Sequence, residues 1–504
     1  MKEMRIILNN VAGNLNCSED QMVLLACIFV SFPLGFINYF IKSPTLRIVY
    51  GLVTGLLIQF FMFEDEMIHC LGATVFTFLY IKFVSRTPYS SPTLLLLMLI
   101  AHFSYLHLRQ MFGWVNLEQK DITLIHMVLI CKLSSVVYCY EDGLTPDTKI
   151  KNEYQRNCKI VIEPTFLEFL SYSFYYSTAA VGPYYEFADF INFIRLEKEY
   201  TNIPMLKAMY NSFYELVYGF ICMFIFLSYK DVYYNSFVLT KEFSEFPYFY
   251  KLFYLNVSML VYTCRYYIAW KFITSVNIFN GLSYDCEEKT TIDGEVVVQD
   301  EFTKIQSAQI LKVVFNPNVK EKIEGWNHQV HLWLKYQVML RFISNNSSFV
   351  RNNRVMLTYL VSAAWHGWYP IYYWVFLDFF FIDRICEVLK KDKFYERLGH
   401  SSYILQFIVG IISLHACNYL GVTFTLLKLE NGITFYKNMY FIPNIIVYLT
   451  FIYVVYIKGE TKTNETARVE PGKKLDMNMV LERDNVIKKI GNYGKNEVGR
   501  KKIK

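Results

Sequence analysis

Long apolar runs recur along nearly the whole of this 504-residue chain, and they constrain its fold more than any other feature. A helix that crosses a lipid bilayer needs about 20 consecutive, mostly apolar residues. Runs of roughly that kind continue until a polar segment begins at residue 458. They are residues 22–40, 46–63, 68–83, 93–108, 122–140, 210–227, 248–269, 355–382, 403–427 and 440–457.

Three further apolar pieces, residues 166–184, 305–315 and 330–343, are shorter or more interrupted by polar residues. Irregular backbone survives at membrane depth only where protein or a water-filled cavity surrounds it. We therefore predict an all-α polytopic membrane protein with about 11 transmembrane helices, given a span of about 20 residues each. The broken pieces are where we expect a functional site.

The composition excludes several other classes of protein. Hydrophobic residues make up 54% of the chain and charged residues 19%, whereas soluble chains carry about 25% charged residues. The 11 cysteines include no Cys-x-x-Cys pair, so neither a zinc site nor a disulfide framework is expected. The first apolar run follows the polar residues 1–21, which predicts a retained span instead of a cleaved signal peptide.

The formal net charge of +6 arises entirely within residues 458–504. We therefore divide the chain into a multi-span membrane domain, residues 1–457, and a basic polar tail, residues 458–504. A basic segment directly after a span predicts a cytosolic C-terminus. A nucleic-acid partner is not expected, because the basic residues do not form a stripe on a folded domain. Lysines at the fourth and third positions from the end, Lys501 and Lys502, are typical of a retrieval signal for the endoplasmic reticulum.

One histidine stands inside a long aromatic run, VSAAWHGWYPIYY. It is His366, and Gly367 and Pro370 should break the helix beside it. Because the imidazole titrates near neutral pH, His366 can act as a general base. The alternative is a core histidine bonded to a backbone carbonyl.

Polar side chains also interrupt the broken segments. The amide of Asn327 can donate a hydrogen bond to a developing oxyanion, or it can simply cap a helix. His328 and His331 share one helix face, but no third metal ligand stands nearby, so no metal is predicted. Gly182 and Pro183 break the helical pattern, and a plain turn is the alternative there.

These segments together resemble the membrane-bound O-acyltransferase family. EGWNHQVHLWLKYQVMLR is similar to the family's Trp-Asn segment and SAAWHGWYPIYY to its Trp-His-Gly segment. VGPYYEFADF resembles the Gly-Pro segment, RYYIAWKFITSVNIFNGLSYD the Ala-Trp-Lys segment and MVLICKLSSVVYCYEDG the Lys-Leu segment. The resemblance extends over residues 104–373 in the family's order, and it is most similar to the lysophospholipid acyltransferase branch.

The resemblance implies a bundle of helices around a catalytic chamber in the endoplasmic reticulum membrane. It puts His366 and Asn327 at the family's two catalytic positions. Acyl-CoA would be a co-substrate, and no cofactor would be needed. The hydroxyl of a lysophospholipid would be the acceptor, so the reaction would remodel the phospholipids among the membrane lipids. The substrate-binding residues would be Trp326, Trp365, Tyr369, Gly182 and Pro183.

Two alternatives stay open at this stage. One is an O-acyltransferase of the same fold that acts on a sterol, a diacylglycerol or a protein. The other is a transporter with a polar chamber, for which an internal two-fold repeat would be expected and none is found in the sequence.

Overall fold

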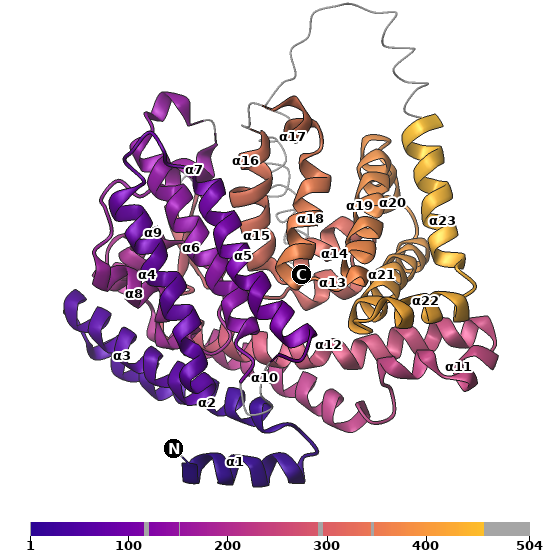
Figure 1. Ribbon diagram of the computed structural model, residues 1–504, viewed down its shortest axis with the longest axis horizontal. Coiled ribbons are helices and arrows are strands. Elements are labelled where there is room, and N and C mark those ends of the chain that lie inside the picture. The colour runs from indigo at the N-terminus through magenta and orange to yellow at the C-terminus, as the bar shows by residue number, and fades with distance from the viewer. Residues whose placement is uncertain (1, 115–119, 151, 291–295, 344–346, 458–504) are drawn as a thin grey trace, which may run out of the picture. The chain divides into compact units, whose positions relative to one another are not determined.

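The computed structural model describes residues 2–114, 120–150, 152–290, 296–343 and 347–457 (Figure 1). The chain divides into two compact units, residues 1–448 and 449–504. The basic tail predicted at residues 458–504 lies outside the described residues. The packing described below belongs to the first unit.

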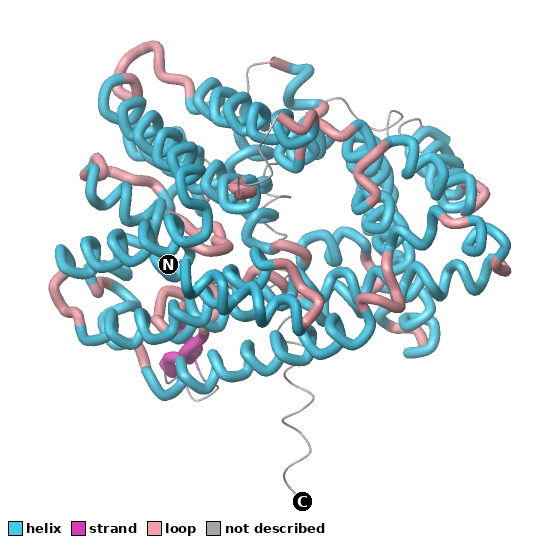
Figure 2. The backbone as a smooth tube through the Cα atoms, turned by 60° about the horizontal axis from the view of Figure 1, so that its bottom comes forward, coloured by secondary structure: helices cyan, strands magenta, loops and turns pink. Residues whose placement is uncertain are grey.

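Helices dominate the described chain, and two strands form its one described sheet (Figure 2). The N-terminal helices are α1 Lys2–Asn14, α2 Glu19–Phe40, α3 Pro44–Phe63, α4 Met67–Phe83, α5 Pro92–Met111, α6 Thr123–Leu144, α7 Glu153–Cys158, α8 Phe166–Phe174, α9 Phe187–Arg195, α10 Met205–Tyr229, α11 Lys241–Glu245 and α12 Tyr248–Phe279. Strands β1 Asp285–Thr290 and β2 Val296–Glu301 pair in antiparallel register. The all-α prediction is confirmed.

The C-terminal part continues with shorter helices and then with long ones. They are α13 Ile310–Phe315, α14 Val319–Gly325, α15 His328–Trp333, α16 Leu340–Ile343, α17 Ser348–Asn352, α18 Arg354–His366, α19 Pro370–Lys391, α20 Phe394–Gly399, α21 Tyr403–Thr425, α22 Leu429–Asn438 and α23 Ile442–Phe451. A π-helical turn, Leu334–Met339, joins α15 to α16.

Six stretches of the described chain are long and apolar enough to cross a membrane. They are Glu19–Phe40, Pro44–Phe83, Pro92–Met111, Thr123–Leu144, Met205–Tyr229 and Tyr403–Thr425. The second stretch is 40 residues long and contains two of the predicted runs, because a short 3-10 turn links α3 to α4. The total of about 11 spans stays a prediction.

Local capping chemistry explains where several spans begin. Ser18 and Gln21 form a reciprocal capping box at the start of α2. Ser43 and Ser91 accept hydrogen bonds from the backbone at the starts of α3 and α5, and each is followed by a proline at the first helical position. Such caps satisfy amide groups that have no partner inside the helix.

The 32-residue helix α12 takes part in both hydrophobic cores of the first unit. Its C-terminal half contributes to the first core and its N-terminal half to the second, and the helix packs against α2, α10 and α21. In Figure 1 it runs beneath the helices that carry the candidate site. Gly219 of α10 lies against Phe272 of α12, where an added Cβ would come within 2.3 Å of the ring.

The three interrupted segments do fold as broken helices. Residues 166–184 form α8, the 3-10 turn Tyr176–Thr178 and a loop, and residues 305–343 form the short helices α13 to α16. The long run 355–382 is split at Gly367, because α18 ends at His366 and α19 begins at Pro370. The predicted helix break beside His366 is therefore confirmed.

Candidate active site

His366 is the last residue of α18, and its side chain is partly exposed. Aromatic rings flank it on several sides: the ring centroids of Phe424 and Phe376 lie 5.0 and 5.4 Å from that of the imidazole. Tyr372, at 6.3 Å, stacks in turn on Phe424 at 4.1 Å. No hydrogen bond joins the His366 imidazole to the rest of the described chain, so both ring nitrogens are available for a substrate.

The helix end that carries His366 is fixed from two neighbouring helices. Trp365 is buried, and its indole donates a hydrogen bond of 2.9 Å to the Met127 carbonyl of α6. The next residue, Gly367, adopts φ +131°, which only glycine takes up readily. An added Cβ at Gly367 would lie 3.3 Å from Nδ1 of His107, on α5. The imidazole of His107 therefore packs directly against this turn.

Asn327 precedes α15 in the left-handed conformation, with φ 42° and ψ 55°. Its side chain is partly exposed and makes no hydrogen bond within the described residues, and it does not cap the helix. The backbone directly after it is held, because the His328 amide donates to the Ser307 carbonyl at 2.8 Å. A side-chain amide without a protein partner is free to donate to a substrate oxygen.

Aromatic contacts hold the Asn327 segment against α12. Trp326 packs on Trp270 and Tyr266 of α12, with centroid distances of 4.9 and 5.8 Å.

Another connection runs from α15 to α18. The ring centroids of Trp333 and Trp365 lie 6.3 Å apart, and Trp333 donates to the Ser134 hydroxyl at 3.1 Å. The two predicted catalytic side chains thus stand on neighbouring segments, although no hydrogen bond joins them in the described chain.

The other predicted binding residues divide into two groups. Tyr369 is the residue directly before α19. Its ring lies 5.5 Å from that of Tyr372, so it is one of the aromatic residues near His366. Gly182 and Pro183 are instead buried in the first core. Gly182 has φ +76°, and an added Cβ would come within 2.6 Å of Val128 on α6. This contact makes the Gly-Pro loop a packing element against α6.

The side chains of His328 and His331 both lie close to Glu324, in the helix that precedes α15. His328 Nδ1 lies 2.9 Å from the Glu324 carbonyl oxygen, and His331 Nε2 lies 4.0 Å from a carboxylate oxygen of the same residue. The described residues include no group of three or more His, Cys, Asp or Glu side chains that could hold a metal ion.

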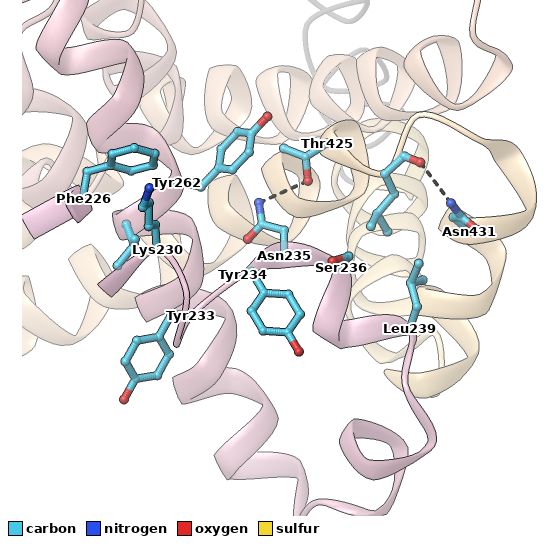
Figure 3. A pocket seen from close by; sticks show the side chains of 12 residues that line it. Phe226, Lys230, Tyr233, Tyr234, Asn235, Ser236, Leu239, Tyr262, Thr425 and Asn431 are labelled. Atoms are coloured by element: carbon cyan, nitrogen blue, oxygen red, sulfur yellow. Dashed lines mark hydrogen bonds between the residues drawn. The ribbon is translucent and has the colours of Figure 1, made fainter. Parts of the chain in front are cut away.

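A cavity of about 330 Å³ opens close to the aromatic residues around His366 (Figure 3). Thr425, directly after Phe424, lines it, and so does Tyr262, one helical turn before Tyr266. Asn235 donates to the Thr425 hydroxyl at 3.1 Å. The full lining is Phe226, Lys230, Tyr233, Tyr234, Asn235, Ser236, Leu239, Val261, Tyr262, Thr425, Leu426 and Asn431, which contains one cation and no carboxylate.

Sequence reasoning missed His107, and it included Lys132 only as part of the Lys-Leu segment, without a role of its own. Lys132, in α6, is buried and donates to the Tyr172 carbonyl at 3.0 Å and the Thr178 hydroxyl at 3.1 Å, which ties α6 to the start of the Gly-Pro loop. Both residues stand within predicted apolar runs, 93–108 and 122–140. The rarity of ionisable residues inside spans, which singled out His366, would have found them too.

Comparison with known families identifies the fold. The profile of the membrane-bound O-acyltransferase (MBOAT) family matches residues 89–428, about two thirds of the chain. The chain belongs to this family. The match covers α5 to α21, and so includes His366, Asn327 and the aromatic residues around them in this MBOAT protein.

Curated relatives of this MBOAT protein cover most of its length. A lysophospholipid acyltransferase of Schizosaccharomyces pombe is 25% identical over 457 residues, which is 86% of each chain. The Danio rerio protein named membrane-bound acylglycerophosphatidylinositol O-acyltransferase mboat7 is 25% identical over 91% of this chain and 98% of its own. A lysophospholipid acyltransferase of Saccharomyces cerevisiae is 25% identical over 88% of this chain and 75% of its own. The predicted family and its lysophospholipid acyltransferase branch are confirmed.

Proposed function

We propose that this MBOAT protein transfers a fatty acyl group from acyl-CoA to the free hydroxyl of a lysophospholipid. The observation that carries the proposal is the His366 imidazole, which stands at a helix break among aromatic rings and has no hydrogen-bond partner in the described part of the chain. The relatives' names support the lysophospholipid as acceptor. The acyl-CoA donor follows from the chemistry that a base and an amide donor can perform on a thioester.

In the proposed reaction, His366 removes the hydroxyl proton of the acceptor while the acceptor oxygen attacks the thioester carbonyl carbon. The new C–O bond forms, and the C–S bond then breaks. The proton on His366 passes to the departing thiolate, so the products are an ester and free CoA, and the imidazole returns to its neutral form. General-base help of this kind contributes about 10²–10⁴-fold.

Asn327 would donate its side-chain amide to the carbonyl oxygen as negative charge develops there. No acyl-enzyme is required, because both substrates are held at once and positioning itself lowers the barrier. The rings of Phe376, Phe424 and Tyr372 keep water from the thioester on the imidazole side. The cavity lined by Thr425, the residue after Phe424, offers space for the polar part of the acceptor.

The test is an acyl-transfer assay on microsomes that contain the chain, with labelled acyl-CoA and a panel of acceptors. We expect a labelled phospholipid when lysophospholipids are offered, and loss of that product in His366→Ala. Label in a sterol ester, a triacylglycerol or a protein, with none in phospholipid, would replace this proposal with the same-fold alternative. Absence of any acyl product from a correctly inserted protein would contradict an acyltransferase function.

We also propose that the protein resides in the endoplasmic reticulum membrane with its C-terminus in the cytosol. The support is the charge pattern of the tail and the lysines Lys501 and Lys502. Protease treatment of sealed microsomes tests the topology, since a C-terminal epitope should be digested without detergent. Protection of the epitope would reverse the assignment.

A further inference from the structure

A buried polar cluster lies where α2 ends, α3 begins and α12 ends, outside the candidate active site. Its members are Asn38 of α2, Arg47 of α3, Tyr175 and Tyr176 before and within the 3-10 turn, and Asn280 at the C-cap of α12. Each of these side chains is more than nine-tenths buried. Helices α2 and α3, which carry two of the five, lie at the lower left of Figure 1.

Arg47 is the unusual member, because it is a buried cation without an anion. It is 3% exposed, and its guanidinium carbon lies 4.5 Å above the centroid of the Phe193 ring. Within the described residues it has no ion pair and no hydrogen bond, and its Nε atom is buried without a partner. A buried charge is costly unless it is paired and hydrogen-bonded.

The other buried cations of the described chain each have an ion-pair or hydrogen-bond partner. Arg109 pairs with the Glu66 carboxylate. Lys132, Lys251 and Lys322 each donate to backbone carbonyls, for example Lys251 to the Asn438 carbonyl at 2.8 Å and Lys322 to the Val314 carbonyl at 2.8 Å. Among the buried cations of the described residues, Arg47 is therefore the one whose side chain has neither an ion pair nor a hydrogen bond.

The polar groups around Arg47 are also unsatisfied. Within the described residues, the Tyr175 and Tyr176 hydroxyls, the Asn280 amide nitrogen and both polar atoms of the Asn38 side chain are buried and make no hydrogen bond of good geometry. Their near polar neighbours are members of the same cluster, since Tyr175 faces Asn38 and Tyr176, and Tyr176 faces Asn280. Leaving each such group unpaired costs about 1–3 kcal/mol. Two phenols, two carboxamides and one guanidinium form a set rich in donors.

Two glycines create the room for this cluster. An added Cβ at Gly51 of α3 would lie 2.2 Å from the Tyr175 ring. One at Gly35 of α2 would lie 3.3 Å from Cβ of Asn280 and 3.7 Å from the Tyr176 hydroxyl. A larger residue at Gly51 would therefore displace the Tyr175 ring, and one at Gly35 would press on Asn280.

We propose that the cluster binds a small anionic group, either an inorganic anion or the phosphate of an anionic lipid. Arg47 supplies the positive charge, and the Asn38 and Asn280 amides and the Tyr175 and Tyr176 hydroxyls donate hydrogen bonds. Bound there, the anion joins α2, α3 and the end of α12 to the 3-10 turn that leads into the Gly-Pro loop. The role is one of stabilisation, and it does not depend on the proposed function.

The test measures thermal unfolding of the purified full chain in detergent at constant ionic strength. Sodium gluconate is the reference salt, and chloride, inorganic phosphate and phosphatidate are added separately. A ligand that binds only the folded state stabilises it by RT ln(1 + [L]/Kd), so the wild-type melting temperature should rise with anion concentration. A response to chloride or phosphate identifies a free ion as the source, and a response to phosphatidate alone identifies a lipid.

Arg47→Met should abolish the response while preserving the length of the buried side chain. The matched control is Arg86→Met, which removes an exposed arginine that pairs with Glu163 and should respond as the wild type does. If Arg47→Met does not accumulate, Asn38→Leu keeps the charge but removes donors, and it should weaken the response. A flat wild-type melting temperature with every anion, or an equal response in wild type and the cluster variant, would overturn the proposal.

Discussion

Replacing Gly367 with alanine tests whether the helix end that carries His366 must keep its present backbone conformation. Gly367 has φ +131° and ψ −175°, a region that is essentially restricted to glycine. Holding alanine there costs about 1–3 kcal/mol. The added Cβ would also lie 3.3 Å from His107 Nδ1, so the imidazole would have to move by a few tenths of an ångström. The backbone strain and the contact with His107 would both arise at the residue next to His366, the proposed base.

The expected result is a loss of turnover that exceeds the loss of stability. If the backbone relaxes to relieve the strain, the end of α18 shifts and takes the imidazole with it. A displacement of about 1 Å near a reacting group can lower the rate about 10²-fold. We therefore expect turnover with labelled acyl-CoA to fall about 100-fold, while the protein still accumulates in membranes with a melting temperature a few degrees lower.

Gly399→Ala is the matched control, because an added Cβ at that helix end meets no atom within 4 Å. The double variant His107→Ala/Gly367→Ala separates the two causes, since it removes the contact but leaves the backbone strain. Partial recovery of turnover in the double variant would assign part of the effect to the His107 contact. Wild-type turnover and stability in Gly367→Ala would refute the reasoning about this turn.

Three further outcomes can be measured with the same preparation. His366→Ala should lower acyl transfer about 10²–10⁴-fold without loss of protein, because it removes the general base; retention of more than about a tenth of the activity would contradict that role. Asn327→Ala should also lower turnover strongly, and Asn327→Asp should not restore it, since an ionised carboxylate cannot donate a hydrogen bond; a fully active Asp variant would rule out the donor role. Changing Lys501 and Lys502 to serine should move a tagged chain out of the endoplasmic reticulum, as seen by fluorescence microscopy. An unchanged reticular distribution would show that these lysines do not determine its location.

The break in the apolar run 355–382 could be predicted from sequence because its causes are local. Glycine and proline act through their own backbone, so Gly367 and Pro370 mark the end of one helix and the start of the next without reference to the rest of the fold. The same is true of the interrupted segments that became short helices. Membrane class follows from composition and run length for a similar reason.

Contacts between distant segments could not be predicted in this way. Nothing in the residues around His107 indicates that its imidazole rests on Gly367, because that contact depends on how α5 packs against α18. Arg47 stands at the start of an apolar run, where a charge normally reaches the membrane interface. Its burial results from the packing of α3 against the 3-10 turn and α9, which no local pattern records.

The enclosure of α6 has a consequence for how the chain is made. In the most apolar window of this helix 83% of the residues are buried inside the protein, and the helix carries Lys132. A lysine at the centre of a span costs about 2.5–3.5 kcal/mol during insertion from the translocon. The groups that later accept its hydrogen bonds, the Tyr172 carbonyl and Thr178 hydroxyl, are synthesised some forty residues afterwards. The cost of Lys132 in α6 is therefore offset only after the chain that follows has packed against the helix, which couples the membrane integration of α6 to tertiary folding.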